Sequence, residues 1–167
     1  IASFALRAAE LHSGRARPAN ATVHFLGVAS FDAPITVRVR TQRAARQATS
    51  VAVEIEQDGR PILAAMIWAV DDGLPGLEHD ELAMPAVPSW SELPTDLDRF
   101  AAEGRDVPPR HAFWDNFERR PPSWISDWEH RTPSPPLYQD WIRFSEGGIE
   151  TEPWRQAARL LLLIDLG

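Results

Sequence analysis

The residue best suited to chemistry in this chain is an aspartate set into an apolar run. Asp165 follows the apolar residues 160–164 and precedes Leu166. An ionised carboxylate is costly to bury unless it is hydrogen-bonded or serves a reaction. A carboxylate on an apolar helix can orient and partly deprotonate a water molecule, which is general-base chemistry. The alternative is a structural aspartate that faces solvent beside Gly167.

Other residue types capable of chemistry give weaker signals. Glu78, His79 and Asp80 have the composition of a metal cluster, but adjacent residues in a loop seldom converge on one ion, so we expect no metal site. His24 falls on a predicted strand and is interpreted as a packing or surface residue. The chain has no Cys and no Gly-x-Ser-x-Gly motif, so we expect neither a Cys nucleophile nor a Ser nucleophile of that type.

Composition limits the class of protein. With 167 residues, of which 44% are hydrophobic, the chain can bury one ordinary core. No apolar run reaches the roughly 18 residues that cross a bilayer, so we expect no membrane span. Residues 1–70 hold 8 Arg against 5 acids, and the remainder holds 9 Arg against 19 acids. This balance argues against a nucleic-acid partner, and the absence of Cys fits a cytoplasmic location.

The first part of the chain predicts one helix followed by an antiparallel sheet. Apolar residues recur at helical spacing over 1–11, and period-two alternation then begins. Asp58 and Gly59 predict a tight hairpin turn. We expect Arg38 and Arg40 to face Glu54 and Glu56 on a solvated sheet face. The predicted strands cover residues 20–27, 34–41, 48–57 and 61–70.

The strand over 61–70 is apolar on both faces, as is typical of a central, covered strand. We therefore expect a sheet curled around a buried helix. The other side of this sheet would meet a second subunit or domain.

The later part of the chain predicts an extended segment and then a second beginning. Residues 71–140 hold 11 of the 15 Pro, which break long elements, and we expect one short helix after Thr95. A strand is predicted over 139–144. A helix begins at 151–153 and carries the apolar run, so we expect it to be buried nearly all round. The abrupt apolar start and end predict an internal piece of a longer protein.

Several motifs, each weak alone, occur in a specific order, and together they resemble the bacterial acyl-CoA thioesterase II-like family. They are Thr-Val-His-Phe-Leu at 22–26, Pro-Ile at 34–35, Asp-Gly-Arg-Pro-Ile at 58–62, Glu-His at 78–79, Met-Pro at 84–85, Phe-Glu-Arg-Arg-Pro at 117–121, Trp-Ile-Arg at 141–143 and Ala-Arg-Leu at 158–160, followed by Asp165.

The resemblance implies an α+β double hotdog fold, in which each of two units is a long helix wrapped by an antiparallel sheet. It divides the chain into a first hotdog unit at 1–72, a Pro-rich linker at 73–110, and the start of a second, incomplete unit at 111–167. In that family, an Asp on the second hotdog helix works with a Thr or Ser and a Gln from later strands to hold the attacking water. Asp165 stands at the position of that Asp, and the partners would follow Gly167.

The implied function is hydrolysis of a fatty acyl-CoA to free acid and CoA, a reaction of lipid metabolism. It needs no cofactor, since CoA is part of the substrate. The implied partners are acyl-CoA and either further copies in a homo-oligomer or the rest of the same chain. Two alternatives stay open, a non-catalytic hotdog module for acyl binding or assembly, and a hotdog hydratase, which would need an Asp–His pair.

Overall fold

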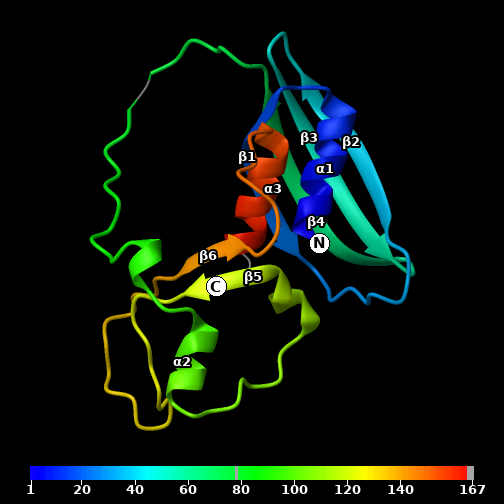
Figure 1. The fold of residues 1–167 in the computed structure, drawn as a ribbon. Coiled ribbons are helices and arrows are strands. Elements are labelled where there is room, and N and C mark those ends of the chain that lie inside the picture. The colour runs from blue at the N-terminus through cyan, green and yellow to red at the C-terminus, as the bar shows by residue number, and fades with distance from the viewer. Residues whose placement is uncertain (78, 165–167) are drawn as a thin grey trace. The chain divides into compact units, whose positions relative to one another are not determined.

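The computed structural model describes residues 1–77 and 79–164 and divides the chain into two compact units (Figure 1). Unit 1 comprises residues 1–78 and 149–167, and unit 2 comprises residues 79–148. The predicted hotdog boundaries at residues 72 and 110 stay a prediction. The elements of unit 1 are α1 (Ala2–Ser13), β1 (Arg17–Phe25), β2 (Thr36–Ala44), β3 (Ala48–Gln57), β4 (Arg60–Val70) and α3 (Pro153–Ile164).

The four strands of unit 1 form one antiparallel sheet in the order β1-β4-β3-β2. The predicted hairpin joins β3 to β4, and both of its turn residues have positive φ, 51° at Asp58 and 73° at Gly59. Asp and Gly tolerate this left-handed backbone better than most residues do. The register pairs Val53 with Ala65, so the inward residues of the two strands lie side by side. As predicted, the apolar strand β4 is central.

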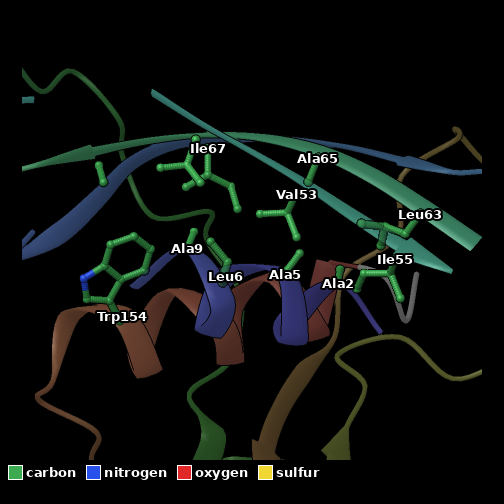
Figure 2. Close-up of a cluster of buried hydrophobic side chains, with 12 residues drawn as sticks. Ala2, Ala5, Leu6, Ala9, Val53, Ile55, Leu63, Ala65, Ile67 and Trp154 are labelled. Carbon is green, nitrogen blue, oxygen red and sulfur yellow. The ribbon is translucent and has the colours of Figure 1, made fainter. Parts of the chain in front are cut away.

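The core of unit 1 lies between the inner face of the sheet and α1 (Figure 2). The helix turns one stripe toward the sheet, at the i, i+3, i+4, i+7 spacing of a single helical face. Three of its four buried residues are alanines, whose small side chains let the helix approach the sheet closely. The stripe is Ala2, Ala5, Leu6 and Ala9, and it faces Val51, Val53, Ile55, Leu63, Ala65, Ile67 and Ala69.

The helix α3 packs beside α1 on the same side of the sheet (Figure 2). The Ser3 hydroxyl donates a hydrogen bond of 3.1 Å to the Ala158 carbonyl, which joins the two helices. The prediction that this helix is buried nearly all round is wrong, because Leu160 and Ile164 are exposed. Apolar composition indicates burial but does not specify what covers each face. Over residues 1–77 and 79–164, one face of α3 packs against the core, and Leu160 and Ile164 lie outside that contact.

The charged residues of the outer sheet face are placed partly as predicted. Arg38 lies opposite Glu54 in the register and forms an ion pair with Glu56. Arg40 lies opposite Ala52, and its Nη1 donates to the side chain of Gln42 at 3.1 Å. The predicted contact of Arg40 with a glutamate is therefore replaced by one along its own strand.

Unit 2 contains short elements joined by long irregular segments. Its helix begins where expected, because the Thr95 hydroxyl accepts from the Asp98 N–H, and the Asp98 carboxylate accepts from the Thr95 N–H, both at 3.0 Å. This reciprocal pair is a capping box, which satisfies two backbone donors at a helix start. The elements are η1 (Trp90–Glu92), α2 (Asp96–Ala102), η2 (Ala112–Asn116), β5 (Phe117–Arg120) and β6 (Trp141–Phe144), with β5 antiparallel to β6.

Over residues 1–77 and 79–164, every helix is too short or too polar to cross a membrane.

Candidate functional site

The predicted catalytic residue, Asp165, lies outside the described residues, but the helix that leads to it is described up to Ile164. The start of α3 is fixed by Glu152, whose carboxylate accepts the N–H groups of Trp154 at 3.0 Å and Arg155 at 2.8 Å. Burial acts to raise the pKa of Glu152, but these hydrogen bonds and the charge of Arg155 outweigh it, so the pKa is lowered. An ionised acid at this end also complements the helix dipole.

Trp154 anchors the helix in the core of unit 1. Its side chain is 2% exposed, and its indole Nε1 donates a hydrogen bond of 2.8 Å to the Arg15 carbonyl. The Arg15 guanidinium in turn donates to Thr49 at 3.0 Å and to Asp71 at 2.7 Å. The first turn of α3 is thereby tied to the ends of α1, β3 and β4.

The packed face of α3 continues toward its last turn. Ala157, Ala158 and Leu161 all contact the core of unit 1. Leu160 and Ile164 are exposed on the other side of the helix. Up to residue 164, α3 therefore has one face docked against the core and exposed apolar residues on the other.

Unit 2 contains a separate cleft of about 750 Å³, walled by aromatic side chains and prolines. On its wall, Arg119 donates to the buried Asp140 carboxylate at 2.8 Å, and the Tyr138 hydroxyl donates to it at 3.0 Å. Burial and the charge of Asp140 raise the pKa of Tyr138. Burial alone would lower the pKa of Arg119, but the hydrogen bond and charge of Asp140 raise it. With both pKa values raised, Tyr138 is neutral and Arg119 is charged near neutral pH, which suits a structural network.

Among the described histidines, His130 has its Nδ1 2.8 Å from the Asp127 carboxylate, and both side chains are exposed. Glu78 lies outside the described residues, His79 lies 3.4 Å from Glu81, and Asp80 accepts the Leu82 N–H at 2.9 Å. Across residues 1–77 and 79–164, no three potential ligands lie close enough together to hold a metal ion. His24 lies on β1 opposite Ala64 and is exposed.

Two polar residues that position the fold were not singled out from the sequence. One is Arg15, described above. The other is Gln57, whose amide nitrogen donates to the carbonyls of Ser30 and Ala33 at 2.9 and 2.8 Å, while its oxygen accepts the Ser30 N–H at 2.8 Å. Gln57 directly precedes the hairpin turn, and no pattern of residue types marks it as buried.

Comparison with known proteins shows what this chain is similar to. Residues 1–70 match the family Acyl-CoA thioesterase N-terminal domain. No curated protein matches the sequence. The predicted resemblance to acyl-CoA thioesterase II-like proteins is confirmed, on the family match and on similarity to the solved structures that follow.

Three solved structures are similar over most of the chain. A thioesterase II candidate from Thermobifida fusca YX has a TM-score of 0.73 at 22% identity, over 98% of this chain and 57% of its own. The acyl-CoA thioesterase II TesB2 of Mycobacterium marinum has a TM-score of 0.66 at 19% identity, over 99% and 57%. A conserved protein of Alicyclobacillus acidocaldarius with a hot dog fold has a TM-score of 0.67 at 21% identity, over 86% and 50%.

The chain spans about half the length of these solved structures. At such identities the likeness shows the fold, and the predicted α+β hotdog class is confirmed.

Proposed function

We propose that this chain, whose residues 1–70 match the acyl-CoA thioesterase N-terminal domain, is part of an enzyme that hydrolyses a fatty acyl-CoA to a free acid and CoA. The family match is the single observation that carries the proposal. The acyl-CoA thioesterase II TesB2 of Mycobacterium marinum, similar over 99% of this chain, supports it.

In the proposed mechanism, Asp165 is the general base. It accepts a proton from a water molecule as that water attacks the thioester carbonyl. The C–S bond then breaks, and the proton passes from Asp165 to the leaving sulfur, which gives the free acid and the CoA thiol. A positioned general base contributes about a hundredfold or more to such a rate. The resemblance implies a Thr or Ser and a Gln, supplied after Gly167, that hold the same water.

The packing of α3 against the core is how this chain would position the general base. In the sequence, Asp165 directly follows Ile164, the last residue of α3 that the structure describes. Trp154 and Leu161 are on the face docked against the core. We propose that the docked stripe fixes the helix, so that the carboxylate is presented in one direction to the substrate.

Free-thiol release from a series of acyl-CoA substrates of increasing chain length, catalysed by the full-length protein, tests the proposal. We expect turnover of at least one chain length, with the optimum reporting the depth of the acyl site. No thiol release from any member of the series would contradict enzymatic hydrolysis and favour a hotdog module that binds an acyl group without reaction.

A further inference from the structure

The outer face of the sheet in unit 1, opposite α1, exposes large apolar side chains at its centre. Trp68 is 56% exposed and Met66 is 43% exposed, both on the central strand β4. Their neighbours across the register are small or uncharged, with Ser50 beside Trp68 and Ala52 beside Met66. An apolar centre of this kind on a sheet face marks an interaction site.

The face is hollowed on both sides of Met66, and each hollow has an arginine on its rim. One hollow of about 400 Å³ is lined by Trp68, Met66 and Arg43 among others. The second, of about 330 Å³, is lined by Met66, Arg40 and Glu54 among others. Neither Arg40 nor Arg43 has a carboxylate partner within the described residues. The two arginines of the hollows outnumber their one glutamate, so the face suits an occupant with both apolar and acidic side chains.

The chain itself contains such a segment at residues 79–84, which we call the acidic segment. It has no regular secondary structure, and its apolar residues Leu82 and Met84 are 94% and 68% exposed. Asp80 and Glu81 stand directly before them and are also exposed. Large apolar side chains left in water beside two carboxylates have the composition that the hollows require.

We propose that the outer sheet face of one copy binds the acidic segment of a second copy. In this contact, Leu82 and Met84 fill the hollows around Trp68 and Met66, while Asp80 and Glu81 pair with Arg40 and Arg43. Each copy offers one face and one segment, so a two-fold dimer contains the contact twice. Two linked contacts bind far more tightly than one, because the second forms at a high effective concentration.

The distribution of charge along the chain favours a contact between the outer sheet face and the acidic segment. Residues 1–70 hold an excess of arginine and the remainder an excess of acids, so unlike parts of two copies attract. Two copies, each with a net charge of −7, repel each other at long range. Salt screens this repulsion beyond about 8 Å at physiological ionic strength. Paired charges in contact are screened much less. The proposal does not depend on the thioesterase function.

The proposal is tested by reversing the charges on each side of the contact in the full chain. Analytical ultracentrifugation then measures the dimerisation of each variant. We expect the wild type to dimerise, and R40E/R43E and D80R/E81R each to dimerise at least about tenfold more weakly, since like charges then face each other. An equimolar mixture of the two variants restores dimers. In the heterodimer, one contact is native and the other has both signs reversed, so both are attractive.

Control variants separate this contact from general charge effects. R46E/R60E changes two exposed arginines outside the hollows, one between β2 and β3 and one at the start of β4. D106R/E146R changes two exposed acids outside the acidic segment. Both variants should dimerise as the wild type does. Trp68→Ala should weaken dimerisation by about thirtyfold, as loss of a central tryptophan does. Circular dichroism establishes that each variant is folded, with R40Q/R43Q and D80N/E81N replacing any that is not.

Three outcomes would overturn the proposal. They are a wild-type chain that stays monomeric over the accessible concentration range, a mixture of the two reversed variants that stays monomeric, and controls that dissociate as readily as the reversed variants.

Discussion

Removal of the Trp154 side chain should detach α3 from the core of unit 1. The indole is 2% exposed, and it fills the space between the two helices and the sheet (Figure 2). Truncation of a buried Trp to Ala costs about 3–5 kcal/mol, from lost burial and the cavity left behind. The free energy of unfolding of a whole protein is only about 5–15 kcal/mol. Trp154→Ala therefore removes a large share of the stability of this unit.

Two further substitutions divide this loss into its parts. Trp154→Phe keeps most of the apolar volume but removes the Nε1 donor, which leaves the Arg15 carbonyl without its 2.8 Å hydrogen bond. An unsatisfied buried acceptor costs about 1–3 kcal/mol. Leu160→Ala, on the exposed side of the same helix, should change stability by no more than about 0.5 kcal/mol.

The assay is urea unfolding followed by amide hydrogen exchange, which reports on the core strands of unit 1 separately from unit 2. We expect the free energy of opening at Val53 and Ile55 to fall in the order Leu160→Ala, Trp154→Phe, Trp154→Ala, with the last the least stable. Equal stability of Trp154→Ala and Leu160→Ala would refute the account of how α3 is anchored.

Three further predictions concern single side chains. Thr95→Ala removes the cap of α2 and should cost about 1 kcal/mol, seen as faster amide exchange over α2, with Thr95→Ser restoring most of the protection. Gln57→Leu leaves the partners in the 30–33 loop unpaired and should cost about 1–3 kcal/mol in chemical denaturation, whereas Gln42→Leu at an exposed position should change little. Hydrogen bonds from Arg143 and a second arginine lower the pKa of Glu118 from its ordinary value of 4.5. The stabilisation from Glu118 is therefore complete above pH 4.5 and lost as the pH falls through the lowered folded-state pKa. Carboxyl NMR titration measures that pKa directly, and a value at or above 4.5 would contradict the contacts.

Elements with strong local signals were predictable from the sequence. Asp58-Gly59 supplies the two positive-φ positions of a hairpin turn, and the structure has both there. Thr95 supplies a capping oxygen, and α2 starts directly after it. The alternation over β3 gave its inward face because a strand with one buried face follows a period of two. These signals act within a few residues and do not depend on the rest of the fold.

What the sequence could not predict depends on contacts between distant residues. Strand β5 has only four residues, and its partner β6 lies twenty residues further on, so no alternation marks it. The apolar run of α3 correctly indicated a helix but not which side has a neighbour, and Leu160 is exposed. The Arg15 carbonyl accepts the hydrogen bond from Trp154 only because the ends of α1, β3 and β4 lie close together in the fold.

The central claim is that Asp165 activates the water that cleaves a thioester. The most direct test is kcat for acyl-CoA hydrolysis by the full-length protein carrying Asp165→Asn, with Asp106→Asn, an exposed aspartate in unit 2, as the matched control. We predict a loss of at least about a hundredfold for Asp165→Asn and unchanged turnover for the control. Turnover within a few-fold of the wild type in a folded Asp165→Asn protein would contradict the account.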